Sequence, residues 1–77
     1  MVDASQIKEH AEVIGSDGAH VGTVDHVENE EIKLTKTDPS AGGLHHFIPL
    51  YFVQSVEGST VRLDRPAEEA MREWSTS

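Results

Sequence analysis

Apolar residues recur along the chain in short runs separated by polar, turn-forming residues, a pattern typical of short β-strands. The first two runs, Val13-Ile14 and Val21–Val27, flank Ser16-Asp17-Gly18. Because aspartate bonds readily to nearby backbone and glycine adopts positive φ, this stretch predicts a β-hairpin. Valine recurs at every third position of the second run, which fits neither a flat strand nor a helix. We therefore expect a bulge or a sharp coil near Gly22 that turns these valines to one inward face.

Four later segments are predicted strands, and the first and last of them alternate apolar and polar residues, as a strand with one buried face does. They are Glu31–Lys36, His45–Ile48, Val53–Val56 and Thr60–Leu63. Pro49 ends the second of them, because proline cannot donate a ladder hydrogen bond. Near the N-terminus, Asp3-Ala4-Ser5-Gln6 matches a capping box and predicts one helical turn.

From Pro66 onward, the apolar period changes to that of a helix. The apolar residues stand at i, i+3, i+4 and i+7, namely Ala67, Ala70, Met71 and Trp74. This spacing predicts one amphipathic helix of about ten residues, which is too short to be stable alone. Its apolar stripe must dock on the strands or on another subunit, and Met71 and Trp74 are the candidate interface residues.

The length of 77 residues leaves room for one domain, to which we assign residues 1–77. The predicted elements indicate a mainly β fold: a small closed or partly open antiparallel β-barrel of about five to six strands with a short C-terminal α-helix. No run of roughly 18 or more apolar residues occurs, and the N-terminus lacks the basic and apolar regions of a secretion signal. We therefore expect a cytoplasmic protein that does not enter a membrane.

Composition narrows the choice of partners. The formal net charge is −8, from 14 acidic and 6 basic residues, and the basic residues are scattered along the chain. The electrostatic field of this negative charge repels phosphate backbones and anionic lipid surfaces. This repulsion argues against a nucleic-acid partner and favours an unidentified protein partner. The sequence contains no cysteine, which excludes disulfides, thiolate metal sites and thiol nucleophiles.

Five histidines are the chemically suggestive feature of the sequence. His26 and His46, with Asp25 as an oxygen ligand, are candidates for a metal site, because neutral imidazole binds zinc, copper or nickel. Their spacing matches no established metal motif, so we assign the histidines structural or surface roles instead. His46 stands two residues before Ile48 and so lies on the same, inward face of the strand. We expect its ring to form a hydrogen bond with a buried backbone carbonyl or with Asp25.

No segment carries the pattern of a catalytic site. No serine is framed as Gly-x-Ser-x-Gly, and the Gly42-Gly43 pair lacks the lysine of a phosphate-binding loop. Asp25 and Glu28 stand three residues apart on a bent strand, where carboxylates are more often solvated than paired. We therefore expect no enzyme, no catalytic residue and no cofactor.

Spaced segments of the chain agree in order with a known family: Val13-Ile14-Gly15-Ser16-Asp17-Gly18, Val21-Gly22-Thr23-Val24-Asp25-His26-Val27, Ile32-Lys33-Leu34-Thr35, Gly43-Leu44-His45-His46-Phe47-Ile48-Pro49-Leu50, Val53, and Ala67-Glu68-Glu69-Ala70 to Trp74. Through them the chain resembles the small bacterial DUF2171-type proteins and, more remotely, the PRC-barrel domains. The resemblance implies a compact barrel of about five or six strands and little about activity. PRC barrels are docking modules in a photosynthetic reaction-centre subunit and in a ribosome-maturation factor. Tyr51-Phe52 departs from the expected pattern, a polar residue followed by tryptophan.

These patterns together predict a non-enzymatic binding or assembly module. We expect its contact surfaces at a mouth of the barrel and along the helix. Self-association into a homo-oligomer is one arrangement, because a chain of this size gains core by pairing. The alternative is a metal- or small-ligand-binding protein that uses the histidine-rich strands.

Overall fold

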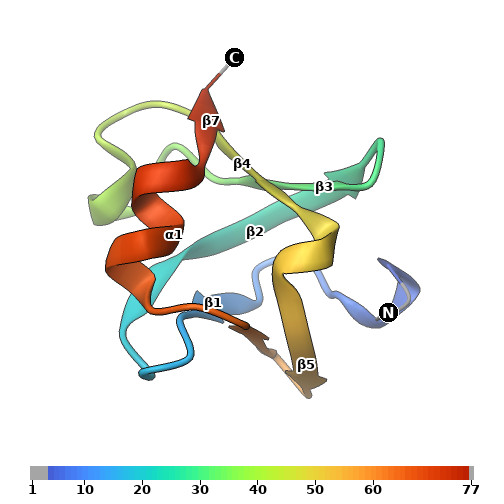
Figure 1. Cartoon of the computed structure of the whole chain (residues 1–77). Coiled ribbons are helices and arrows are strands. Elements are labelled where there is room, and N and C mark those ends of the chain that lie inside the picture. Colours follow the sequence, from blue (N-terminus) through green and yellow to red (C-terminus); the bar gives the residue numbers. More distant parts are fainter. Residues whose placement is uncertain (1–3, 77) are drawn as a thin grey trace.

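The computed structural model describes residues 4–76, which contain seven strands in one sheet of order β5-β6-β1-β2-β3-β4-β7 (Figure 1). The strands are β1 (Glu12–Ile14), β2 (His20–Glu28), β3 (Glu31–Leu34), β4 (His46–Pro49), β5 (Val53–Glu57), β6 (Thr60–Leu63) and β7 (Ser75–Thr76). The other elements are the 3-10 turns η1 (Ala4–Gln6), η2 (Pro39–Ala41) and η3 (Leu50–Phe52) and the helix α1 (Ala67–Glu73). The chain is therefore mainly β with a short C-terminal helix, as predicted. The predicted turn at the N-terminus is η1, although its expected cap, Asp3, lies outside the described residues.

Five of the six neighbouring strand pairs are antiparallel, and β1 with β6 is parallel. The expected all-antiparallel arrangement is therefore wrong at this pair. η3 bends the chain between β4 and β5 instead of reversing it, so the β5–β6 hairpin reaches the far end of the sheet (Figure 1). This bend places β6 beside β1 with both strands running in the same direction.

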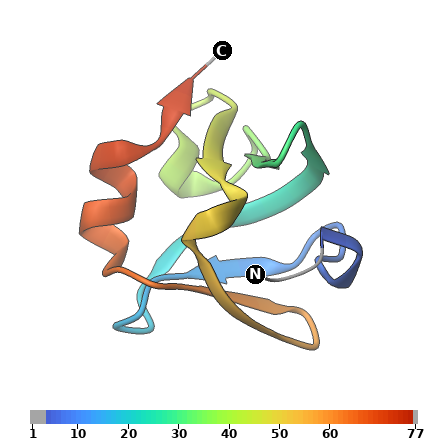
Figure 2. The ribbon, with the colours of Figure 1, turned by 45° about the vertical axis from the view of Figure 1, so that its right-hand side comes forward.

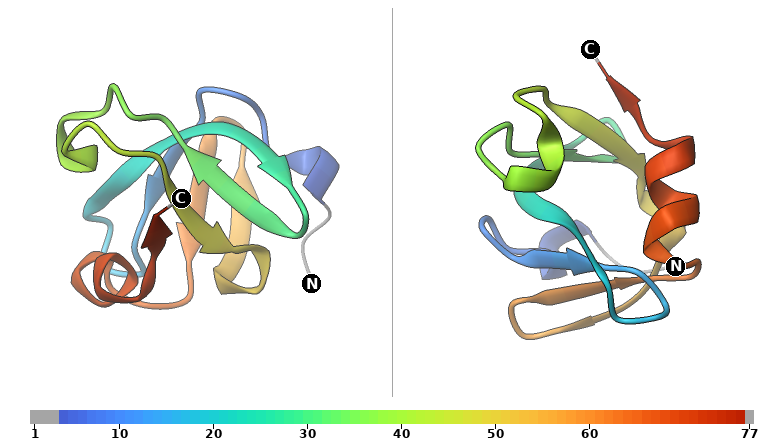
Figure 3. Two further views of the ribbon diagram at one scale, coloured as in Figure 1. Left: turned by 90° about the horizontal axis from the view of Figure 1, so that it is seen from above. Right: turned by 90° about the vertical axis from the view of Figure 1, so that its left-hand side faces the viewer.

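The sheet is not closed, and its edges are β5 and β7. The expected count of five or six strands is too low, because β7 pairs with β4 through His46 with Thr76 and Phe47 with Ser75. Two polar residues beyond a helix show no apolar alternation, so the sequence contained no sign of this strand. The two views of Figure 3 show the sheet curled, with β2 crossing it as a long arc.

Two bulges bend β2, and the spacing of its valines predicted one of them. The pairing register shifts between His20 and Gly22, opposite β1, and between Val24 and His26, opposite β3. Val21 and Val24 are both fully buried as a result, whereas Val27, which was expected on the same inward face, is only partly buried. The prediction of a bulge near Gly22 is therefore confirmed, and the second bulge adds to the curl of the sheet.

The turn between β1 and β2 holds the start of α1. Asp17 Oδ1 accepts hydrogen bonds from the backbone N–H of Ala19 at 3.2 Å and of Ala67 at 3.3 Å. The bond from Ala19, followed by that from Ala67, lowers the pKa of the Asp17 carboxyl. A Cβ at Gly15 would lie 2.2 Å from the Ala67 nitrogen, so only glycine allows this close approach. The predicted hairpin turn therefore also caps a helix far along the chain.

α1 has seven residues rather than about ten, because the backbone becomes extended at Trp74 (φ −69°, ψ 157°). Ala67 and Ala70 are buried on the core, whereas Met71 and Trp74 are partly buried. Figure 2 shows α1 along one side of the curled sheet. The remaining buried residues of this core are Ile7, Ala11, Val13, Val21, Val24, Ile32, Leu34, Ile48, Leu50, Phe52, Val53, Val61 and Leu63. Between residues 4 and 76, no helix has the length and apolar character needed to cross a membrane.

Candidate functional site

His20 bridges two carboxylates from different parts of the chain. Its Nδ1 lies 2.9 Å from Glu12 Oε2 on β1, and its Nε2 lies 2.7 Å from Asp38 Oδ2, just before η2. Asp38 is 9% exposed and also accepts a hydrogen bond from Thr23 Oγ1 at 2.8 Å. The hydrogen bond with Glu12, supported by Asp38 and opposed by partial burial, raises the pKa of His20. The contacts of His20 with Glu12 and Asp38 therefore hold the β3–β4 connection against β2 most strongly when His20 is protonated.

His45 and His46 hold the other half of the same connection. His45 Nδ1 donates to the Leu34 carbonyl oxygen at 2.9 Å, and His46 Nε2 donates to the Ala41 carbonyl oxygen at 2.9 Å. His46 is buried, so it has the inward position and the carbonyl partner expected from the sequence. Its Nδ1 is buried and has no hydrogen-bond partner within residues 4–76. Both histidines therefore have a structural role in this segment.

The metal-site candidates have separate sets of contacts. His26 Nε2 lies 2.6 Å from Glu28 Oε1, and His26 Nδ1 lies 3.7 Å from Asp25 Oδ1. His46 contacts the Ala41 carbonyl and Trp74 instead. In the part of the chain that the structure describes, no group of three or more histidine and acidic side chains is arranged to hold a metal ion.

The interface candidates Met71 and Trp74 lie on α1 and at its end. The Trp74 ring stacks on His46, with ring centroids 3.8 Å apart and planes inclined by 16°. Both candidates pack against the core and remain partly exposed. Trp74 therefore anchors the end of the helix on β4, and a role in an interface stays a prediction.

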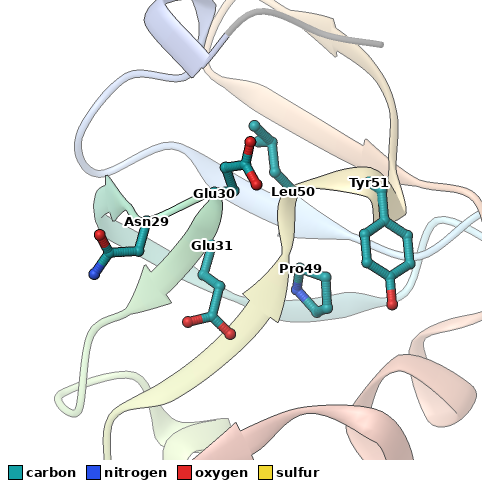
Figure 4. A pocket seen from close by; sticks show the side chains of 6 residues that line it. All are labelled: Asn29, Glu30, Glu31, Pro49, Leu50 and Tyr51. Carbon is teal, nitrogen blue, oxygen red and sulfur yellow. The ribbon is translucent and has the colours of Figure 1, made fainter.

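A pocket of about 460 Å³ opens at the corner where the β2–β3 turn meets η3 (Figure 4). Two short segments line it: Asn29, Glu30 and Glu31, and Pro49, Leu50 and Tyr51. The Leu50 N–H donates to the Glu30 carbonyl oxygen at 2.8 Å, and Glu31 pairs with Pro49 in the ladder. We call this site the corner pocket. Its walls are joined by backbone contacts, so its shape is preformed.

The turn on one wall of the corner pocket has an unusual backbone. φ is 50° at Asn29 and 61° at Glu30, both in the left-handed region. Such a two-residue turn suits the twist of a hairpin, but its second position ordinarily carries glycine. Asparagine tolerates this conformation, whereas for glutamate it costs about 1–2 kcal/mol. Glu30 is therefore a strained residue on the rim of the pocket.

Tyr51 supplies an aromatic ring at the opposite wall. It is 69% exposed, and its ring meets that of Phe52 edge to face, with centroids 5.2 Å apart and planes at 74°. The guanidinium carbon of Arg65 lies 3.5 Å from the centroid of the same Phe52 ring. None of the six lining residues is basic, and two are glutamates. The corner pocket therefore combines negative charge with an aromatic face.

Sequence reasoning identified neither wall of the corner pocket as a site. Glu28-Asn29-Glu30 appears only as a polar turn, and Tyr51-Phe52 only as a departure from the family pattern. The available signals were an asparagine in a two-residue turn and an aromatic residue shortly after a strand-ending proline. Their meeting depends on the pairing of β3 with β4, which local patterns do not reveal.

The fold and the corner pocket define a small, mainly β protein with an open, curled sheet and a preformed acidic and aromatic recess. The chain belongs to the family of uncharacterized proteins conserved in bacteria, DUF2171, whose model matches residues 7–71. This match confirms the first resemblance and includes both walls of the pocket, whereas the remoter resemblance to PRC barrels is not confirmed. No curated protein and no solved structure shows significant similarity to the chain.

Proposed function

We propose that this protein is a non-enzymatic binding module that receives a segment of a partner protein in the corner pocket. The observation that carries the proposal is Tyr51, an aromatic side chain 69% exposed beside a preformed recess of about 460 Å³. Pockets of this size are usual for bound ligands, and aromatic residues dominate the binding energy of many protein interfaces.

The rigidity of the corner pocket supports this proposal. The hydrogen bond from Leu50 to Glu30 and the ladder pair of Glu31 with Pro49 hold both walls before anything binds. The edge-to-face contact with Phe52 restricts the Tyr51 ring. Few side chains of the pocket therefore lose conformational freedom when a partner binds, which lowers the entropic cost of binding.

Charge favours a protein partner. The net charge of −8 repels nucleic acid and anionic lipid, and the corner pocket adds two glutamates at the contact site itself. A protein segment with basic or neutral polar residues meets no such repulsion.

Self-association through α1 is a second arrangement that one observation favours. Met71 and Trp74 belong to the apolar stripe of the helix, yet both remain partly exposed. A second copy of the chain would cover them. Native mass spectrometry of untagged protein purified without chelator tests this arrangement, because a multimer supports it and a monomer at micromolar concentration refutes it. A metal adduct of one ion per chain would instead favour the alternative with His26 and His46 as ligands.

The main proposal is tested by selecting random peptides displayed on phage against the wild-type protein. Selected peptides should shift the backbone amide NMR signals of residues 29–31 and 50–52. Tyr51→Ser should weaken their binding by about tenfold or more, as expected for an aromatic anchor of an interface. Leu44→Ser is the matched control, because Leu44 is the second exposed large apolar residue (53%) among residues 4–76 and does not line the corner pocket.

Two results would refute the proposal. One is a selection that yields no peptide binding at the corner pocket. The other is a set of peptides whose affinity falls equally with Leu44→Ser and Tyr51→Ser, which would indicate general adhesion to exposed apolar groups.

A further inference from the structure

We infer that the corner pocket receives the guanidinium group of an arginine on an extended segment of the partner protein. This inference rests on the proposed function, because it names the chemistry of the partner at the same site. Three features of the described residues support it: the charge of the rim, the aromatic wall and the strained turn.

The rim of the corner pocket carries two carboxylates that have no counter-ion among residues 4–76. Neither Glu30 nor Glu31 makes an ion pair or a side-chain hydrogen bond with another residue between 4 and 76. Glu28, on the other side of the same turn, differs because it pairs with His26 at 2.6 Å. Figure 4 shows the Glu31 carboxylate on the side of Pro49 and Tyr51 and the Glu30 carboxylate beside Leu50, so the two point to opposite sides of the turn. A cation stacked on Tyr51 is therefore attracted mainly by Glu31, and Glu30 adds a weaker attraction over a longer distance.

The aromatic wall suits a flat cation. An arginine side chain stacks well on a tyrosine face when the ring is exposed, as the ring of Tyr51 is. The protein already makes this kind of contact one residue along, where Arg65 lies over the face of Phe52 at 3.5 Å. The partner's arginine would occupy the equivalent position on Tyr51.

The strained turn indicates that a carboxylate at position 30 has a use. Glycine in this place would relax the left-handed backbone at Glu30, and asparagine, as at Asn29, would tolerate it. The Glu30 side chain makes no ion pair and no hydrogen bond with another residue between 4 and 76. Backbone strain that folding does not require is typical of binding and catalytic sites.

Arginine fits these features better than lysine does. Its planar guanidinium donates hydrogen bonds in a fork that matches carboxylates, and its flat face stacks on an aromatic ring at the same time. The lysine ammonium is more strongly hydrated and has no flat face. The acidic field of the whole chain also attracts basic segments over a longer range.

The inference is tested with a defined probe, N-acetyl-arginine methylamide, titrated into ¹⁵N-labelled protein. The neutral isostere N-acetyl-citrulline methylamide and the lysine analogue are the matched probes. We expect the arginine probe to shift the signals of residues 29–31 and 50–52, with an affinity in the millimolar range that falls as salt is added. The citrulline probe should leave these signals unchanged, and the lysine probe should bind more weakly.

Variants assign the interaction to individual groups. Glu31→Gln should weaken binding of the arginine probe by about two- to fivefold, the range for one partly exposed ion pair. Glu30→Gln should weaken it by less, because the Glu30 carboxylate lies beside Leu50 on the other side of the turn (Figure 4). Glu57→Gln is the matched control, because it removes the same charge at the far end of β5, outside the lining of the corner pocket. It should leave the affinity of the probe unchanged.

The outcomes separate this inference from the function on which it rests. Equal binding of the citrulline or the lysine probe overturns the guanidinium assignment, as does an equal loss with Glu57→Gln. Selected peptides that bind the corner pocket through Tyr51 but contain no arginine also overturn it, and they leave the binding function in place. Peptides whose binding does not depend on Tyr51 overturn both.

Discussion

Replacing Glu30 by glycine should stabilise the fold and weaken binding at the corner pocket. Glu30 has a φ of 61°, which glycine adopts without strain. Relief of this strain adds about 1–2 kcal/mol to the free energy of unfolding. The greater freedom of glycine in the unfolded chain removes about 0.5–1 kcal/mol. The two effects together give a net gain of about 0–1.5 kcal/mol, centred on about 0.5–1 kcal/mol.

Glu30→Gly removes few interactions that would offset this gain in stability. The Glu30 side chain is exposed and makes no ion pair with another residue between 4 and 76. The hydrogen bond from Leu50 goes to the backbone carbonyl of residue 30, so Glu30→Gly retains it. For a domain of this length, a gain of about 0.5–1 kcal/mol raises the melting temperature by about 2–8 °C.

Thermal and urea unfolding, followed through the fluorescence of the single tryptophan, measure the effect. Glu30→Asn should also stabilise, because asparagine tolerates a left-handed backbone and removes the same carboxylate. Glu31→Gly is the opposing control: residue 31 lies in β3, where glycine lowers the stability by about 0.5–1 kcal/mol. Both glycine variants should lose affinity for the arginine probe.

A stability loss in Glu30→Gly like that in Glu31→Gly would refute the assignment of strain to the turn. A stabilised Glu30→Gly variant that binds the arginine probe as well as the wild type would confirm the strain and contradict its connection with binding.

Three further predictions concern other parts of the fold. His20→Gln should lower the stability more at about pH 5.5 than at about pH 8.5. Glu12 and Asp38 raise the pKa of His20 in the folded protein above 6.5, the pKa it has in the unfolded chain. The protonated His20 therefore stabilises the fold fully at pH values below 6.5, and this stabilisation is lost as the pH rises through the raised pKa of the folded state. Equal losses of stability in urea unfolding at both pH values would contradict this. Gly15→Ala should cost about 2 kcal/mol or more, because its Cβ would lie 2.2 Å from a backbone nitrogen of α1; an unchanged melting temperature would show that the helix start is not packed there. Trp74→Ala should cost about 2–3 kcal/mol by circular dichroism, less than a fully buried aromatic, because the stack on the His46 ring is lost; unchanged stability with loss of a multimer would place Trp74 in an interface instead.

Strands with a clear alternation were predicted from the sequence, because the information is local. Ile32 and Leu34 on β3, and Val61 and Leu63 on β6, are buried as their period-two spacing indicates. The β1–β2 turn and the bulge near Gly22 follow from backbone preferences and from the spacing of valines over a few residues. The start of α1 after Pro66 follows from the change to a helical period.

The candidate sites were less predictable, because they join segments far apart in the chain. The His46 partner could be anticipated as a buried carbonyl, but not as that of Ala41. The carboxylates around His20 come from β1 and from the β3–β4 connection, and no sequence spacing relates them. The corner pocket likewise needs a turn and a 3-10 segment that meet only when β3 and β4 pair.

By itself, the sequence determined the strand and helix faces, the turns and the acidic character of the surface, because each depends on side chains and backbone preferences within a short window. Only the tertiary structure decided the parallel β1–β6 pair, the pairing of β7, the partners of the histidines and the corner pocket. The reason is that local patterns specify which face of an element is buried but not which other element covers it. That choice results from the packing of the whole sheet around one core.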